Sequence, residues 1–179
     1  MRNARIHSTT ILGLRRNGKS ALGGDGQVTY GDTILKEGAL KLRKLYNDTI
    51  MAGFAGATAD AFSLFEKFEA KLDEYSGNMS RSVVELAKDW RTDKILRRLE
   101  AMLIIMDREK SYLVSGDGDV VEPDDGILAI GSGAPYAIAA ARAYIDSSRL
   151  AAPKIVEKSL SIASSICVYT NANITVMEL

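Results

Sequence analysis

The order in which hydrophobic periodicity changes along the chain is the feature that most constrains its fold. Residues 9–16 and 19–24 mix β-branched and apolar side chains, and Asn17-Gly18 between them is typical of a two-residue hairpin turn. A second hairpin is expected where residues 41–46 meet residues 49–55. The first third of the chain is therefore predicted to be antiparallel β-structure.

From residue 57 onwards, apolar side chains recur at three- and four-residue steps, which indicates a helix. A break at residues 76–78 ends this helix, and Ser80 is expected to cap the start of a second one. The apolar positions are Phe62, Phe65, Phe68 and Leu72 in the first helix, and Val83, Ala87, Trp90, Leu96, Leu99 and Leu103 in the second.

The rest of the chain repeats this alternation. Strands separated by helix pairs favour an α+β fold over the βαβ alternation of a doubly wound sheet. Helix pairs on both sides of two sheets fit a four-layer α-β-β-α sandwich, although the periodicities leave the order of the layers open. The further strands are expected over about residues 103–107, 111–116, 127–131 and 174–178, and the further helices over about residues 135–147 and 153–166.

Composition excludes several classes of protein. The 179 residues suit one domain, and 23 basic side chains against 23 acidic ones remove the general electrostatic argument for nucleic-acid binding, leaving only a local basic patch open. One Cys forms no internal disulfide, and one His with one Cys cannot build a His/Cys metal cage. No apolar run reaches the length of a membrane span or a signal peptide, so a cytoplasmic location is expected.

Residues 13–20, GLRRNGKS, match the letters of the phosphate-binding loop G-x-x-x-x-G-K-[ST]. That loop works only if its Lys and Ser open a helix whose N–H groups face the phosphates. Residues 21–26 contain three glycines and have poor helix propensity. A β-hairpin turning at Asn17-Gly18 explains this segment better, so no nucleotide is expected on this chain.

Thr9 and Thr10 begin a β-branched strand behind a short polar leader, residues 1–8. Taken alone, the pair is explained by the preference of Thr for strands. Cleavage between Ser8 and Thr9 would, however, create a terminus that carries a hydroxyl and a free α-amine on one residue. An α-amine with a pKa of about 7.7–8.0 is partly neutral near neutral pH and can accept the hydroxyl proton. Such a nucleophile needs neither His nor Cys.

Three other features strengthen this hypothesis. Asp25 lies in a glycine-rich bend, Lys41 lies in a predicted strand, and Gly53 and Gly56 lie close together farther along the chain. A half-buried Lys costs desolvation energy unless it is paired, and Asp25 is a candidate partner. A Lys close to Thr9 would lower the pKa of the hydroxyl and keep the α-amine neutral.

Several motifs occur in order along residues 9–179. They are TTI at 9–11, GDGQVT at 24–29, LYND at 45–48, AGFAG at 52–56, TADAF at 58–62, ELAKDWRTD at 85–93, AIGSG at 129–133, PY at 135–136 and ICVYTN at 166–171. This set resembles the HslV (ClpQ) family, the proteasome-β-like peptidase subunits of the bacterial HslUV (ClpYQ) protease. The segments at 45–48 and 87–93 favour this family over other proteasome β subunits.

The resemblance implies the four-layer sandwich of an N-terminal-nucleophile hydrolase, with a leader at residues 1–8 and one peptidase domain at residues 9–179. Thr9 matches the family nucleophile, which uses its own α-amine as base. The reaction would pass through an ester-linked acyl-enzyme that water hydrolyses.

The resemblance also assigns roles to four further residues. Lys41 would tune the Thr9 hydroxyl, and Asp25 would hold Lys41 and the new terminus. Ser132 would steady the α-amine, and the Gly53 N–H would supply the oxyanion hole.

A sodium ion held by backbone carbonyls is implied by the resemblance as well, at Ser164, Cys167 and Thr170. Ser164-Ser165 stands where the family more usually has Gly-Asp, but carbonyl ligation tolerates a changed side chain. Cys167 itself is predicted to be a buried small hydrophobe. Ala57, at the border of the expected substrate groove, and Ala134 also replace common family glycines.

The resemblance implies a double hexameric ring capped by a hexameric AAA+ unfoldase, HslU (ClpY). The unfoldase would consume the ATP, deliver unfolded protein substrates and order the active site, while no nucleic acid or membrane is expected as a partner. Three alternatives stay open: a catalytically silent ring subunit, a different N-terminal-nucleophile amidohydrolase acting on a small amide, and the phosphate-loop NTPase. The presence of Thr9, Asp25 and Lys41 disfavours the silent subunit.

Overall fold

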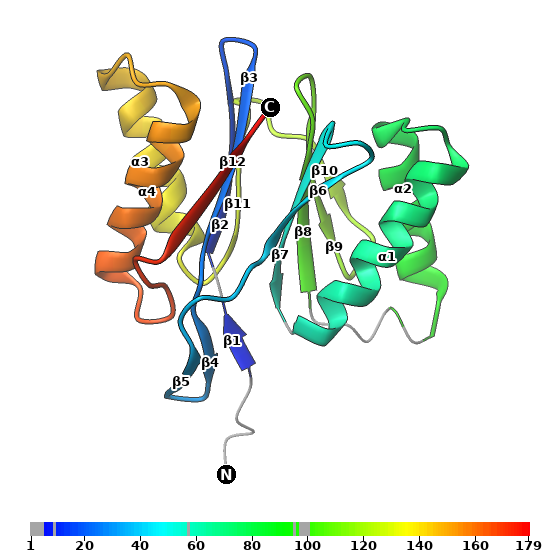
Figure 1. Ribbon diagram of the computed structural model, residues 1–179, viewed down its shortest axis with the longest axis horizontal. Coiled ribbons are helices and arrows are strands. Elements are labelled where there is room, and N and C mark those ends of the chain that lie inside the picture. The colour runs from blue at the N-terminus through cyan, green and yellow to red at the C-terminus, as the bar shows by residue number, and fades with distance from the viewer. Residues whose placement is uncertain (1–5, 9, 57, 95, 97–100) are drawn as a thin grey trace.

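The chain forms four layers in the order helices, sheet, sheet, helices (Figure 1). The computed structural model describes residues 6–8, 10–56, 58–94, 96 and 101–179. Within this part of the chain, helix pairs cover the outer faces of two antiparallel sheets. The α+β sandwich predicted from the periodicities is confirmed, and the order of its layers is now defined.

The first inner sheet is built around the N-terminal hairpin and has four strands. Its strand order is β11-β2-β3-β12, and every neighbouring pair is antiparallel. The predicted turn at Asn17-Gly18 is confirmed, because both residues have positive φ, as a tight hairpin turn requires. The strand bounds are β2 Thr10–Arg16, β3 Lys19–Asp25, β11 Ile127–Gly131 and β12 Ile174–Glu178.

The second inner sheet has five strands in the order β10-β9-β8-β7-β6. It contains the second predicted hairpin, which joins β6 to β7. Its bounds are β6 Leu42–Leu45, β7 Ile50–Gly56, β8 Ala101–Met106, β9 Ser111–Ser115 and β10 Val120–Val121.

The helices pack as two pairs, and each pair covers one sheet (Figure 1). The pair α1 and α2 covers the five-stranded sheet, and the pair α3 and α4 covers the four-stranded one. Pro135 and Pro153 lie in the first turns of α3 and α4, where a missing N–H costs nothing. The bounds are α1 Thr58–Glu74, α2 Met79–Thr92, α3 Ala134–Ser147 and α4 Ala152–Ile166.

A small third sheet, not anticipated from the sequence, lies at one end of the sandwich (Figure 1). Its strand order is β1-β4-β5, and the bounds are β1 Ile6–Ser8, β4 Val28–Tyr30 and β5 Thr33–Lys36. The first of these strands belongs to the expected leader and pairs antiparallel with β4, so that Ile6 faces Tyr30 and Ser8 faces Val28.

Three apolar cores hold the layers together. One lies between α1, α2 and the five-stranded sheet and contains Trp90, which is fully buried. A second lies between α3, α4 and the four-stranded sheet, and a third lies between the two sheets. Because each sheet buries both faces, the central strands carry nearly continuous apolar runs such as LIIM at 103–106.

The second helix differs from its predicted form at both ends. Its N-cap is Asn78 rather than Ser80, because the Asn78 side chain accepts a hydrogen bond from the Arg81 N–H. The helix ends at Thr92, so Leu96 lies outside it and Leu103 lies in β8. Leu103 of the following strand continued the helical spacing by chance, and Leu99 lies outside the described residues.

Residues 13–20 lie in β2, the Asn17-Gly18 turn and β3, as the hairpin interpretation predicted. Lys19 and Ser20 therefore open a strand, and no helix N-terminus is present there to receive a phosphate. Among the described residues, no helix is long and apolar enough to cross a membrane.

Phe68→Ala should lower the free energy of unfolding by about 3–5 kcal/mol, because the ring is fully buried between α1 and the sheet. Phe62 was predicted to share this face, but 45% of it is exposed. Phe62→Ala is therefore the matched control, with an expected loss below about 1 kcal/mol. Urea unfolding at fixed protein concentration measures both values, and equal losses would contradict the assigned helix orientation.

Candidate active site

A buried ion pair, Asp25 and Lys41, lies where the two inner sheets and the small third sheet approach one another. The Lys41 Nζ is 3.6 Å from the Asp25 Oδ1, and both side chains are almost completely buried. Asp25 ends β3, and Lys41 directly precedes β6. The predicted pairing of these two residues is therefore present in the structure.

Three backbone N–H groups hold the Asp25 carboxylate. Thr10 N–H donates to Oδ1 at 2.7 Å, while Gln27 and Asn171 N–H groups donate to Oδ2 at 3.0 and 3.1 Å. These donors come from β2, the bend after β3 and the turn before β12. The carboxylate therefore joins three distant segments at one point.

Lys41 is held by Asp25 on one side and by the Gln27 carbonyl, which accepts a hydrogen bond from Nζ, on the other. Burial removes water from the ammonium and lowers the pKa of Lys41 from 10.5 to about 8. Attraction to Asp25 opposes this shift but does not cancel it. A buried lysine with a pKa so close to neutrality is typical of a functional site.

The glycine after Asp25 is required by close packing. A Cβ on Gly26 would lie 2.2 Å from the Glu37 carbonyl oxygen. The Gly26 carbonyl in turn accepts a hydrogen bond from the Ala39 N–H. Through this contact, the segment that leads to Lys41 is fastened to the bend that carries Asp25.

Thr9, the expected nucleophile, lies outside the described residues. Thr10 is described, fully buried, and its hydroxyl is occupied by hydrogen bonds to the Gly133 N–H and the Thr170 hydroxyl. Thr10 therefore presents no free hydroxyl at the surface of the site. Ser132 is exposed and directly follows Gly131, the residue that pairs with Thr10 across β11 and β2.

Gly53 lies in the middle of β7, opposite Leu42 of β6 and Ile104 of β8. A Cβ here would lie 2.9 Å from side-chain atoms of Ile11 and Leu42, so the glycine allows the two sheets to approach. The neighbouring Phe54 N–H donates to the Lys41 carbonyl, and strand alternation directs the Gly53 N–H toward β8. Its role as oxyanion donor stays a prediction.

The three residues of the expected sodium site lie at the C-terminal end of α4. Ser164 is in the last turn, Cys167 caps the helix and is buried as predicted, and Thr170 closes the following turn by donating its N–H to the Cys167 carbonyl. Carbonyl oxygens at the negative end of a helix dipole suit a hard cation in chemical kind. Bound sodium stays a prediction.

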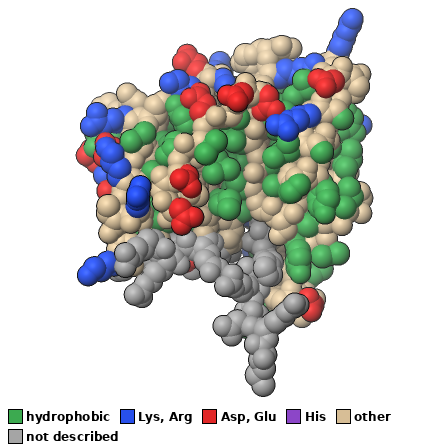
Figure 2. All heavy atoms as spheres, turned by 180° about the vertical axis from the view of Figure 1, so that it is seen from behind, with side chains coloured by type: hydrophobic (Ala, Val, Ile, Leu, Met, Phe, Trp, Pro, Cys, Tyr) green, Lys and Arg blue, Asp and Glu red, His purple; other side chains and the backbone are tan. Residues whose placement is uncertain are grey.

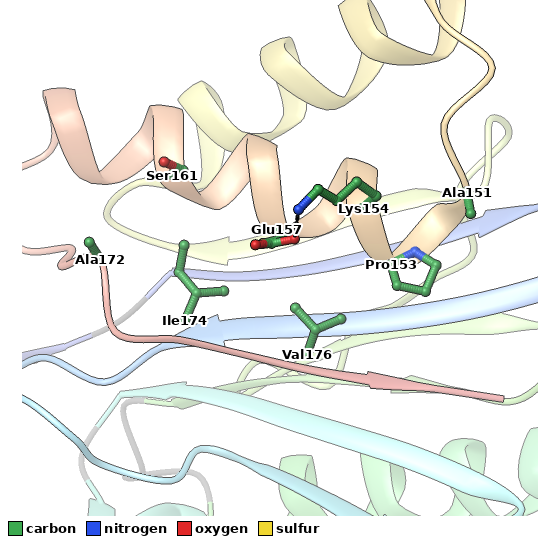
Figure 3. A pocket seen from close by; sticks show the side chains of 8 residues that line it. All are labelled: Ala151, Pro153, Lys154, Glu157, Ser161, Ala172, Ile174 and Val176. Atoms are coloured by element: carbon green, nitrogen blue, oxygen red, sulfur yellow. Dashed lines mark hydrogen bonds and ion pairs between the residues drawn. The ribbon is translucent and has the colours of Figure 1, made fainter.

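A cavity of about 570 Å³ lies between α4 and β12 (Figure 3). Its walls are mostly small or apolar, and Lys154 and Glu157 form an ion pair at 2.6 Å beside it. Neither Asp25 nor Lys41 lines this cavity. It is therefore separate from the candidate active site.

Sequence reasoning did not single out several residues that build the site. Gln27 holds Lys41 through its carbonyl, and its side-chain amide donates to Thr29 and to the Val168 carbonyl. Asn171 holds Asp25 and donates from its side chain to the Glu37 carbonyl. Gln27 and Asn171 lie in the motifs GDGQVT and ICVYTN, so position within these motifs was the available signal.

Between pH 8 and 10.5 the free energy of unfolding should rise with pH, because native Lys41 has released a proton that the unfolded chain still binds. The rise amounts to at most about 3 kcal/mol and should disappear in Lys41→Met. Lys44→Met, on the exposed side of β6, is the matched control and should keep the rise. Denaturant unfolding across this pH range measures the slope, and an unchanged slope in Lys41→Met would contradict the lowered pKa.

Comparison with known proteins places this chain in a family. The sequence model described as "Proteasome subunit" matches residues 6–179. The ATP-dependent protease subunit HslV of Pseudothermotoga lettingae is 59% identical over 172 residues, which cover 96% of this chain and 98% of that protein.

Solved structures agree with this match. Eukaryotic HslV from Trypanosoma brucei superposes with a TM-score of 0.91 at 48% identity, over 95% of this chain and 98% of that one. Thiobacillus denitrificans BPH in complex with epoxomicin shares the fold, with a TM-score of 0.77 at 20% identity over 95% and 97% of the two chains. The chain belongs to the proteasome subunit family, within its HslV branch.

Proposed function

We propose that the chain is the threonine-type endopeptidase subunit of a two-component ATP-dependent protease, with Thr9 as nucleophile after removal of residues 1–8. One observation carries the proposal. The buried Asp25–Lys41 pair is tied by a hydrogen bond to the Thr10 N–H, one residue from Thr9. The name of the Pseudothermotoga relative, an ATP-dependent protease subunit, supports the same class of reaction.

In the proposed reaction the Thr9 hydroxyl attacks a peptide carbonyl and passes its proton to the α-amine of the same residue. The tetrahedral intermediate collapses when the amine returns this proton to the leaving nitrogen, which leaves an ester on Thr9. Water, activated by the same amine, then hydrolyses the ester. A backbone N–H would stabilise the oxyanion, and Ser132 would steady the α-amine. The resemblance assigns the oxyanion donor to Gly53, although strand alternation directs its N–H toward β8.

Lys41 supplies positive charge in this scheme. With a pKa of about 8 it is mostly cationic at neutral pH, so it favours developing negative charge on the Thr9 oxygen. Asp25 keeps the ammonium in place through the ion pair, and its three N–H donors keep the carboxylate itself fixed. Neither histidine nor cysteine has a part in the reaction.

The pairing of β1 with β4 supports an extended mode of peptide binding. Residues 6–8 lie antiparallel to β4 directly before Thr9. An unfolded protein segment can add to the same strand edge by main-chain hydrogen bonds, which tolerate varied side chains. This tolerance suits a protease that receives unfolded substrates.

We propose a double hexameric ring of this chain, capped by the hexameric AAA+ unfoldase HslU, which consumes the ATP. Large apolar side chains exposed on the single chain support burial in an assembly. Apolar groups gather on the face seen in Figure 2. Among the described residues of the whole chain, Leu35, Leu40, Ile166 and Val168 are strongly exposed. A cytoplasmic location follows from the same proposal.

A sodium ion held by the carbonyls of Ser164, Cys167 and Thr170 is proposed as a structural ion. It would neutralise the carbonyl end of α4 and stiffen the turn that leads to Asn171. That turn holds the Asp25 carboxylate, so the ion would act on the site only through the protein.

Thr9→Ala should abolish hydrolysis of a fluorogenic peptide in the presence of the unfoldase and ATP, because it removes the attacking oxygen and retains the fold. Thr9→Ser keeps both hydroxyl and α-amine and should retain measurable turnover. Intact mass of the active wild-type protein should show a chain that begins at Thr9.

Two outcomes would contradict the proposal. One is full activity in Thr9→Ala, and the other is active wild-type protein that still carries residues 1–8. Assembly with the unfoldase but no hydrolysis by wild type would instead indicate a silent ring subunit. Hydrolysis of small amides but not of peptides would indicate an amidohydrolase.

A further inference from the structure

The Thr10 hydroxyl occupies an unusual position for a residue at the start of a strand. It is fully buried, accepts a hydrogen bond from the Gly133 N–H at 2.9 Å, and lies 2.7 Å from the Thr170 hydroxyl. A buried hydroxyl is costly unless it is hydrogen-bonded, and a strand position alone would be served equally well by valine. The hydroxyl therefore has a specific task.

Gly133 gives independent support for this task. Its φ of −88° is open to any residue, so its backbone conformation does not require glycine. A Cβ at this position would, however, lie 2.3 Å from the Thr10 Oγ1 and 2.8 Å from the Thr170 Oγ1. Glycine is thus required at position 133 because the two hydroxyls occupy the space that a side chain would need.

Thr10 takes part in a hydrogen-bond network that returns to Asp25. Its N–H donates to Asp25, and its hydroxyl contacts Thr170. The residue after Thr170 is Asn171, whose N–H donates to the other oxygen of Asp25. The hydrogen bond from the Gly133 N–H to the Thr10 hydroxyl connects the loop that carries Ser132 to this network.

We propose that Thr10 is a positioning residue: its hydroxyl locks the loop of residues 131–133, and with it Ser132, against the strand that begins beside Thr9. This role rests on the proposed function, because it concerns the alignment of the Thr9 α-amine with Ser132. The Thr170 hydroxyl, hydrogen-bonded to the Thr10 hydroxyl, holds it in the orientation that accepts the hydrogen bond from the Gly133 N–H. Thr10 does not itself touch the substrate.

Thr10→Val keeps the shape and removes the hydroxyl, whereas Thr10→Ser keeps the hydroxyl and removes a methyl group. With a fluorogenic peptide, the unfoldase and ATP, Thr10→Val should lower kcat about 10- to 100-fold, because a small displacement of reacting groups is costly. The KM should change by less than about threefold, since peptide binding is unaffected. Thr10→Ser should restore kcat to within about threefold of wild type.

Thr170→Val removes the hydroxyl that contacts Thr10. Its kcat tests the same inference if Thr10→Val does not fold. It should lower kcat in the same direction, and the double variant should lose little more than Thr10→Val alone, because the two hydroxyls act as one unit. Ser82→Ala is the matched control. It removes a buried, hydrogen-bonded hydroxyl from α2, remote from the site, and should leave kcat unchanged.

Three results would overturn the inference: wild-type kcat in Thr10→Val, an equal loss in Thr10→Val and Thr10→Ser, or additive losses in the double variant. Failure of the proposed function is recognised separately, either by activity that persists in Thr9→Ala or by a wild-type protein that hydrolyses no peptide. If Thr9→Ala is inactive and Thr10→Val is fully active, only the positioning role of Thr10 is wrong.

Discussion

The buried Asp25–Lys41 ion pair is the interaction on which the rest of the site depends. An ion pair in a dry interior is stable only when further hydrogen bonds satisfy its charges. Asp25 meets this condition with three backbone N–H donors, and Lys41 meets it with the Gln27 carbonyl. The donors belong to segments far apart in the chain, so the full set of hydrogen bonds exists only where the fold brings these segments together.

Close packing of neighbouring atoms explains Gly26, Gly53 and Gly133 better than conformational freedom does. A side chain on Gly26 would collide with the Glu37 carbonyl, and one on Gly133 would collide with two hydroxyls. A side chain on Gly53 would press the two sheets apart. At each of these glycines, neighbouring atoms occupy the space that a side chain would take, so the segments around the site are closely packed.

The site lies outside the apolar cores that the two helical layers cover, although its loops lead into α3 and out of α4. Both helix pairs lie on the outer faces (Figure 1), and each packs on its own apolar core. The polar groups gather instead at the end of the sandwich where the small third sheet lies. A stable, apolar interior can therefore carry a charged site at its edge, because the cost of burying two charges is met locally by hydrogen bonds.

The sequence alone predicted the elements whose patterns are local. The hairpin at Asn17-Gly18 and the strands over residues 127–131 and 174–178 have the bounds expected, since turn chemistry and apolar runs act over a few residues. The predicted end of α2 was wrong, because Leu103 of β8 continued the helical spacing. Only the packing of the folded chain shows that this residue belongs to a strand and not to the helix. The third sheet was missed because its strands are short and β5 is exposed throughout.

For the site, the residues themselves indicated an Asp25–Lys41 pair and a nucleophile that needs neither His nor Cys, while the individual roles followed from the resemblance. Only the tertiary structure revealed the hydrogen bonds that join Thr10 to Gly133 and Thr170. Thr10 is separated from Gly133 by 123 positions and from Thr170 by 160. No local pattern can encode such contacts, because hydrogen bonds over these separations depend on how β2, β11 and the turn after α4 are brought together by the packing of the whole chain.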